Sequence, residues 1–282
     1  MVMSLEAFKK SKDFLVCIDS DGCAIDSMNV KHFNCFGPEL VVEWNLDRWR
    51  EKILERWNYV NLFSLTRGIN RFKGLFLALN EINEKYVRVE DLDSFADWVE
   101  STKELSNNSL TRAIESNPGS ICLKKALSWS NRVNASIEKL PKEKVVPFAM
   151  VKEALVLAHE KADVAIVSSA NLGAIMDEWK RHELLPHVDL VLAQDSGTKA
   201  YCIGQLLKKG YDRDKVIMCG DALGDMDAAE QNGVFYYPIK ANFEKESWIE
   251  FINVGFNKLL EGSYSGEYQS RKNDEFIKNL SK

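Results

Sequence analysis

Residues 14–22 read Phe-Leu-Val-Cys-Ile-Asp-Ser-Asp-Gly, and the predicted fold follows from this stretch. Five apolar residues without polar alternation are typical of a parallel strand covered on both faces. Asp19 and Asp21 follow directly, and residues two apart on an extended chain point to the same side. Gly22 then allows a sharp turn. The stretch therefore predicts a buried strand that ends in two carboxylates facing one site.

The pair of carboxylates has two interpretations. Two acids on one side repel each other, so the pair is favoured where a cation binds or where one acid keeps its proton. A strand followed by an ordinary polar Asp-Gly turn would give the same residues. The tetrapeptide by itself leaves both interpretations open.

Four further apolar runs resemble the first and predict a parallel sheet. They are Val164–Ser168, Leu190–Ala193, Val216–Gly220 and Gly233–Ile239. The segments between them have helical character, as in Ala200–Lys209, which Gly210 ends. Alternation of strands and helices predicts a doubly wound, Rossmann-like α/β domain. From Phe243 onward we expect one or two helices packed on this core.

A long helical insertion separates the first strand from the second. Apolar residues recur there at helical spacing. They are Leu46, Trp49, Ile53 and Trp57; Ile69, Phe72, Phe76 and Leu79; and Ala126, Trp129, Val133 and Ile137. The pattern predicts four or five amphipathic helices without strands. We therefore expect residues 1–30 and 145–282 to form the α/β core and residues 31–144 to form a helical domain.

Three later segments place polar residues after predicted strands. Ser168 and Ser169 follow the second strand, where hydroxyls and helix amides suit an anion, although such residues are often only helix caps. Lys199 opens a helix, a position that slightly disfavours a cation and so asks for a reason. Asp221 and Asp225 follow the fourth strand, and hard carboxylate oxygens suit Mg²⁺. Ligands of open α/β sheets bind at this edge.

The run of residues 19–27, Asp-Ser-Asp-Gly-Cys-Ala-Ile-Asp-Ser, resembles the first motif of the haloacid dehalogenase superfamily. It is most similar to the branch of phosphoglycolate phosphatase and β-phosphoglucomutase, with Cys23 where that branch has Thr or Val. The three later segments follow in the order of the family's motifs. The resemblance covers residues of roughly 14–34 and 145–240.

The resemblance implies a Mg²⁺-dependent phosphatase with an aspartyl-phosphate intermediate. Asp19 would be the nucleophile and Asp21 the general acid and base. Ser168, Ser169 and Lys199 would bind the phosphoryl group. The implied metal site comprises the Asp19 carboxylate, the Asp21 backbone carbonyl and Asp221, with Asp225 in support.

The helical insertion lies where such enzymes carry a helical cap that closes over the site. Hinges are expected near Asp26–Phe33 and Lys142–Pro147. Within the insertion, Arg67 and Arg71 are candidates for contact with an anionic leaving group. A solvated helix start explains the same cations equally well.

Composition restricts the function further. A net charge of −5 argues against a nucleic-acid surface. Six cysteines without a CxxC pair, and no predicted secretory or membrane-spanning segment, favour reduced thiols in a cytoplasmic protein. The expected partner is a small phosphorylated metabolite, bound by a monomer or homodimer.

Several alternatives use related chemistry. A phosphotransferase or phosphosugar mutase would use Asp19 in the same way, and the motifs do not separate it from a phosphatase. A dehalogenase is disfavoured by Asp21, and no lysine is placed for a phosphonate hydrolase. A non-catalytic phosphometabolite-binding protein is disfavoured because the acids of all the motifs are present.

Overall fold

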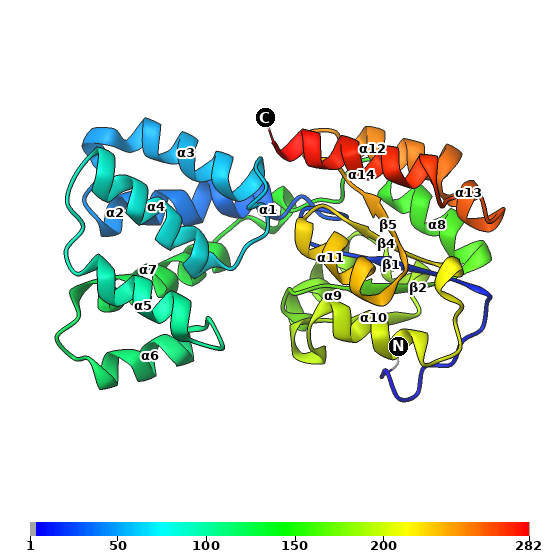
Figure 1. Cartoon of the computed structure of the whole chain (residues 1–282), viewed down its shortest axis with the longest axis horizontal. Helices are drawn as coiled ribbons and strands as arrows, with labels where there is room; N and C mark the ends of the chain where they lie inside the picture. Colours follow the sequence, from blue (N-terminus) through cyan, green and yellow to red (C-terminus); the bar gives the residue numbers. More distant parts are fainter. Residues whose placement is uncertain (1–3, 282) are drawn as a thin grey trace. The chain divides into compact units, whose positions relative to one another are not determined.

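The computed structural model describes residues 4–281 as two compact units (Figure 1). The α/β unit joins the described residues up to Met28 with those from Val145 onward, and the helical unit is Asn29–Lys144. The chain therefore leaves the α/β unit after its first strand and returns to it before its second.

A five-stranded parallel sheet forms the centre of the α/β unit, which confirms the predicted fold class. The strands are β1 (Phe14–Ile18), β2 (Ala162–Val167), β3 (Leu190–Leu192), β4 (Val216–Gly220) and β5 (Phe235–Pro238), in the order β3-β2-β1-β4-β5. In the register, Ile18 pairs with Ile166 on one side and with Cys219 on the other. The residues that follow β1, β2 and β4 therefore meet at one edge of the sheet.

Helices connect and cover these strands. They are α8 (Val151–Lys161), α9 (Leu172–Arg181), α10 (Lys199–Leu207), α11 (Leu223–Asn232), α12 (Glu244–Glu250), α13 (Phe256–Leu260) and α14 (Glu267–Leu280). A π-helical turn, Phe251–Gly255, joins α12 to α13, so the C-terminal part contains two helical runs as expected. Side chains of Asn171 and Thr198 cap α9 and α10 by accepting hydrogen bonds from first-turn amides.

The helical unit has a core of its own. Its helices are α1 (Met28–Lys31), which begins one residue before the unit, α2 (Gly37–Glu43), α3 (Arg50–Leu62), α4 (Arg71–Lys85), α5 (Leu92–Ser101), α6 (Asn107–Ser116) and α7 (Ile121–Glu138), with a π-helical turn at His32–Phe36. Trp57, Phe72, Phe95 and Trp129 are buried in its core. No strand is assigned in Asn29–Lys144, all of which is described, as predicted.

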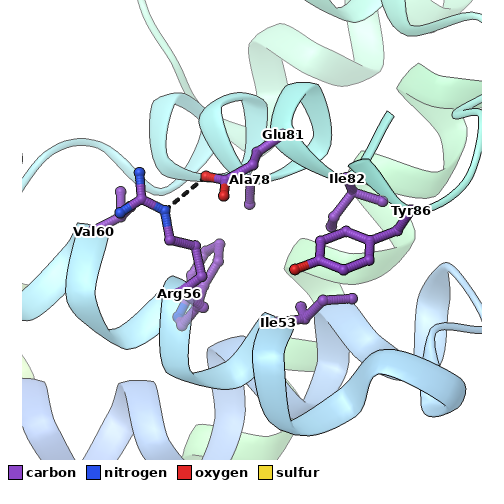
Figure 2. Close-up of a pocket in the computed structure, with 8 residues that line it drawn as sticks. Ile53, Arg56, Val60, Ala78, Glu81, Ile82 and Tyr86 are labelled. Carbon is purple, nitrogen blue, oxygen red and sulfur yellow. Dashed lines mark hydrogen bonds and ion pairs between the residues drawn. The ribbon is translucent and has the colours of Figure 1, made fainter. Parts of the chain in front are cut away.

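A small cavity lies between α3 and α4 in the helical unit (Figure 2). Apolar side chains such as Ile53 and Ile82 line most of it, and an ion pair between Arg56 and Glu81 lies beside it at 2.7 Å. The polar groups of its lining are this ion pair, the Tyr86 hydroxyl and the Trp57 indole N–H. The indole N–H donates a hydrogen bond to His32. We interpret the cavity as an imperfection of helix packing.

The two segments that connect the units are hydrogen-bonded to each other inside the α/β unit. Asp26 donates its backbone N–H to Val146 at 2.8 Å, and Phe148 donates to Ala24 at 3.0 Å. An antiparallel bridge joins Ile25 and Pro147 between these bonds. The chain thus leaves the α/β unit and re-enters it at one place.

Two general features of the chain bear on the earlier expectations. All six cysteines are buried free thiols. Among residues 4–281, no helix combines the length and the apolar character needed to cross a bilayer.

Asp163 fastens the segment before β1 to the sheet. The side chain is fully buried at the start of β2 and accepts hydrogen bonds from the backbone amides of Ser11 and Lys12 at 2.9 and 3.0 Å. The hydroxyls of Ser11 and Tyr211 donate to the same carboxylate. Burial raises the pKa of Asp163, but these hydrogen bonds lower it more, so the carboxylate stays ionised.

We predict that Asp163→Asn destabilises the chain by about 3 kcal/mol at neutral pH, because an amide presents N–H groups to donors that need an acceptor. A depressed pKa contributes stability above the ordinary pKa of an aspartate, and that stability is lost as the pH falls through the depressed value. The difference between native chain and variant therefore shrinks in acid. Urea unfolding measures it, with the exposed Asp13→Asn as the control; equal stability of native chain and Asp163→Asn at neutral pH would contradict the role of Asp163.

Candidate active site

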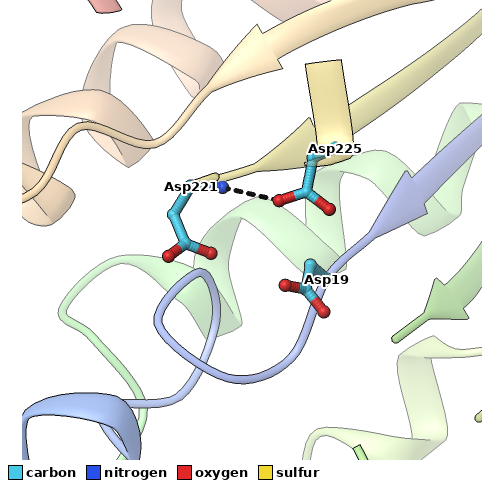
Figure 3. Close-up of side chains that lie close together, drawn as sticks. All are labelled: Asp19, Asp221 and Asp225. Atoms are coloured by element: carbon cyan, nitrogen blue, oxygen red, sulfur yellow. Dashed lines mark hydrogen bonds between the residues drawn. The ribbon is translucent and has the colours of Figure 1, made fainter. Parts of the chain in front are cut away.

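Three carboxylates meet at the edge of the sheet where β1 and β4 end (Figure 3). Asp19 follows β1, Asp221 follows β4, and Asp225 lies in the first turn of α11. One carboxylate oxygen from each residue lies within 4.8 Å of one from each of the others. The three residues are 5%, 1% and 0% exposed, so the cluster is shielded from water.

Lys199 provides the cation of this cluster. Its Nζ lies 2.8 Å from Oδ2 of Asp19 and 2.5 Å from Oδ1 of Asp225, and the side chain is 14% exposed. Lys199 is the first residue of α10, where the helix dipole disfavours a positive charge. The two carboxylates explain why a lysine is nevertheless found there.

The charges in the cluster do not balance. Burial raises the pKa of Asp19 to about 7, and Asp225 and Asp221 add to the rise, although the Lys199 ammonium lowers it. Burial also lowers the pKa of Lys199, but Asp19 and Asp225 raise it more, so Lys199 stays charged. With all three carboxylates ionised, the cluster would carry two negative charges beyond the one that the Lys199 ammonium offsets. A divalent cation would neutralise them.

Asp225 orders the loop that carries Asp221. Its Oδ2 accepts hydrogen bonds from the backbone amides of Asp221 and Ala222 at 3.2 and 3.1 Å, while its Oδ1 accepts from Lys199. The side chain therefore fixes both a carboxylate and the cation of the cluster. The predicted supporting role of Asp225 is consistent with these bonds, and Asp227 in the same helix is exposed.

Two features of this loop have no counterpart in the sequence analysis. A Cβ atom on Gly220 would lie 2.3 Å from Cβ and Cγ of Asp225, so only glycine allows the close approach. Tyr236, in β5, donates a hydrogen bond from its hydroxyl to the Gly220 carbonyl, at a distance of 2.9 Å. The Gly220-Asp221 pair in the sequence could have indicated the close approach of Asp225 to Gly220. Nothing near Gly220 in the sequence indicates the bond from Tyr236.

Asp21 is two residues from Asp19 in the sequence. Within the described residues 4–281, its carboxylate is not part of the cluster of Asp19, Asp221 and Asp225. Its Oδ1 accepts a hydrogen bond from the hydroxyl of Ser27 at 2.6 Å, and the residue is partly exposed. The Ser27 hydroxyl therefore restrains this carboxylate. Ser27 ends the motif of residues 19–27, and its bond to Asp21 is not predictable from the sequence.

The two serines after β2 differ in their surroundings. Ser168 is 3% exposed and donates its backbone N–H to Leu192 at 2.9 Å, and the register of β1 and β2 places it at the edge where Asp19 lies. Ser169 is exposed. Asn171, rather than Ser169, caps α9.

Arg67 and Arg71 belong to the helical unit and differ strongly. Arg67 is 2% exposed, and its guanidinium donates to the Leu62 carbonyl at 2.6 Å, which ties it into the unit. Arg71 donates to Asn134 at 2.7 Å and to Ser130 at 3.1 Å. Burial lowers the pKa of Arg71, and within the described chain no carboxylate lies within ion-pair distance of it.

Residues 69–237 match the family described as haloacid dehalogenase-like hydrolase. The matched segment includes Ser168, Lys199, Asp221 and Asp225 and begins after Asp19 and Asp21. No curated protein sequence matches the chain.

Solved structures that are similar to this chain have low sequence identity to it. A proposed phosphatase from Clostridium difficile has a TM-score of 0.50 and 15% identity, over 81% of this chain and 86% of that chain. A haloacid dehalogenase-like hydrolase from Streptococcus pneumoniae has a TM-score of 0.49 and 14% identity, over 83% and 90%. A proposed β-phosphoglucomutase from Thermotoga maritima has a TM-score of 0.47 and 15% identity, over 80% and 84%. At these identities the likeness concerns the fold alone.

We predict that Gly220→Ala destabilises the chain by about 2–3 kcal/mol, because the added methyl group overlaps Asp225 and forces the backbone to move. Gly224→Ala is the matched control, since nothing lies within 4 Å of a Cβ at that position. Urea unfolding should leave the control within about 0.5 kcal/mol of the native chain. Equal stability of the two variants would show that the loop yields without cost.

A second prediction concerns the charge of Asp19 in the metal-free chain. Because its pKa is raised from the ordinary value of 3.8 to about 7, its ionisation costs stability progressively as the pH rises from about 4 to about 7, and no further above that. Asp19→Asn should therefore gain in melting temperature over the native chain between about pH 5 and pH 7.5, by roughly 2–4 °C or more. Thermal unfolding in chelator tests this, with exposed Asp227→Asn as control. A difference that does not change with pH would be contrary to the prediction.

Proposed function

The chain belongs to the haloacid dehalogenase-like hydrolases, and we propose that it is a Mg²⁺-dependent phosphatase acting on a small phosphomonoester through an aspartyl-phosphate on Asp19. The observation that carries this proposal is the buried cluster of Asp19, Asp221 and Asp225 around Lys199. It combines a nucleophile, a cation and an excess of negative charge at the edge where open α/β sheets bind ligands.

The donor set of the cluster fits Mg²⁺. All three side chains offer hard carboxylate oxygens, and when all three are ionised their charge exceeds that of Lys199 by two. Asp19, Asp221 and the backbone carbonyl of Asp21 would hold the ion, with Asp225 ordering the loop around it. When bound, the ion would offset negative charge between the nucleophile and the phosphoryl group.

The proposed reaction has two displacements at phosphorus. An Asp19 oxygen attacks in line, and the bond from phosphorus to the leaving oxygen breaks, which leaves an acyl phosphate on Asp19. Asp21 gives its proton to the leaving oxygen. Asp21 then takes a proton from a water molecule whose oxygen attacks phosphorus. The bond from phosphorus to the Asp19 oxygen breaks, which releases phosphate and restores the Asp19 carboxylate.

Other residues of the site hold the groups that react. The Ser27 hydroxyl bonded to Asp21 restrains the proposed acid and base. Lys199 lies within hydrogen-bond distance of Asp19 and is placed to neutralise charge on the transferring group. Ser168, at the same edge, would donate its hydroxyl to a phosphoryl oxygen.

For the helical unit we propose the role of a cap that recognises the leaving group. The support is its insertion between the loop of Asp19 and β2. Arg71 is the better candidate for an anionic contact, because it lacks a carboxylate partner in the described chain while Arg67 is committed to a backbone carbonyl. A substrate with a second anionic group would suit Arg71.

We predict that the native chain releases phosphate from at least one member of a panel of phosphorylated metabolites, and that release depends on Mg²⁺. The panel should contain esters with and without a second anionic group. Asp19→Asn should lower kcat by at least about 10³-fold, because it removes the nucleophile. Exposed Asp227→Asn should retain native activity.

The assay also separates the alternatives. Release that persists in Asp19→Asn would exclude the aspartyl-phosphate mechanism. Transfer of labelled phosphate to a sugar acceptor in place of water would favour a phosphotransferase or mutase. Failure of every ester, with Mg²⁺ bound, would refute the phosphatase and favour a binding role.

A further inference from the structure

The loop that carries the proposed nucleophile closes on itself. We call residues 19–27 the Asp19 loop. Backbone amides of Ala24 and Ile25 both donate to the Ser20 carbonyl, at 3.0 and 2.9 Å, and the Gly22 amide donates to the Ile25 carbonyl at 2.8 Å. These bonds set the shape of the loop but do not by themselves attach it to its surroundings.

Besides its backbone bonds to Cys219 and to residues 146–148 and the Lys199 ion pair, the loop has a side-chain contact from α9. Trp179 donates its indole N–H to the hydroxyl of Ser20 at 2.9 Å, and both side chains are fully buried. Ser20 lies between the proposed nucleophile Asp19 and the proposed acid and base Asp21. A hydrogen bond to Ser20 therefore restrains the backbone between the two reacting carboxylates.

Another side-chain contact to the loop comes from α12. Trp248 donates its indole N–H to the backbone carbonyl of Cys23 at 3.1 Å, and both residues are fully buried. The helix is itself fixed to the sheet, because the Tyr237 hydroxyl of β5 donates to the Ser247 carbonyl at 2.7 Å. Trp248 lies beyond the segment that matches the family, which ends at residue 237. The C-terminal part of this chain thus reaches the Asp19 loop.

We propose that Trp179 and Trp248 are positioning residues that fix Asp19 and Asp21 for in-line attack; this inference rests on the proposed function. Each indole satisfies a buried acceptor that water does not reach, so loss of the N–H is not made up by solvent. The N–H fixes the direction of the bond, and phenylalanine lacks both this N–H and part of the indole ring. A displacement of the nucleophile by 1 Å can lower a rate by about 100-fold.

The first experiment compares Trp179→Phe and Trp248→Phe with the native chain. Hydrogen exchange of the Ala24 and Ile25 amides should accelerate by about tenfold in each variant, because the loop opens more often. With an ester that the native chain hydrolyses, kcat should fall by about tenfold or more while KM stays within about twofold. Tyr264→Phe is the matched control.

The control variant loses a comparable bond elsewhere. Tyr264 is fully buried in the α/β unit, and its hydroxyl donates to the Tyr236 carbonyl at 2.7 Å, away from the Asp19 loop. Urea unfolding of all three variants measures the general loss of stability, which is larger where part of the indole ring is removed. Unchanged loop exchange and kcat in Tyr264→Phe, with changes in both tryptophan variants, support positioning; equal changes in all three variants overturn it.

A double-variant cycle tests the specific bond of Trp179. Ser20→Ala removes the acceptor and should lower kcat as Trp179→Phe does, because it leaves the indole N–H unsatisfied. In the double variant both partners are apolar, so kcat should exceed the product of the two single effects by about tenfold. If the effect on kcat in the double variant equals the product of the two single effects, the role of this bond is overturned.

The exchange measurement needs no substrate, so it separates failure of this inference from failure of the proposed function. If no ester is hydrolysed but both tryptophan variants accelerate exchange in the loop, the phosphatase is refuted and the attachment of the loop is supported. If native exchange persists in both variants, or exchange accelerates while kcat is unchanged, the positioning role is overturned.

Discussion

Exclusion of water from a group of like charges is the constraint on which the rest of this structure depends. Asp19, Asp221 and Asp225 are nearly inaccessible to solvent, so their repulsion must be met by the protein or by a bound cation. Lys199 meets part of it. The parallel sheet holds these side chains together, because the adjacent strands β1 and β4 end at the same edge. Without the sheet, the repulsion between the carboxylates would separate them.

The surrounding contacts serve that arrangement. Asp225 bonds at once to Lys199 and to the backbone beside Asp221, so displacement of one member disturbs the others. Gly220 gives Asp225 the room to approach. The cluster is therefore a connected network, in which the energetic contribution of one residue depends on the others.

Local patterns in the sequence predicted the strands and the polar residues that directly follow them. Unbroken apolar runs revealed the buried strands, and the polar residues directly after them revealed the edge of the sheet, since strand ends are covalently next to those residues. The contacts from Trp179 and Trp248 were not predictable, because they cross 159 and 225 residues of sequence. The burial of Arg67 was missed for a related reason: a guanidinium bonded to a backbone carbonyl has the same local sequence as a solvated one. The roles of the site residues and the cap remain predictions.

The pairing of the two connecting segments bears on how the chain reaches its native state. β1 must pair with β2 across the whole helical insertion, with Phe14 beside Ala162, and such a distant pairing is entropically slow for an open chain. The helical unit contains its own apolar core, and its ends are joined through the ribbon of Ala24–Asp26 and Val146–Phe148. Collapse of that core before the strands pair would shorten the effective loop between β1 and β2, so we expect the helical unit to acquire structure first.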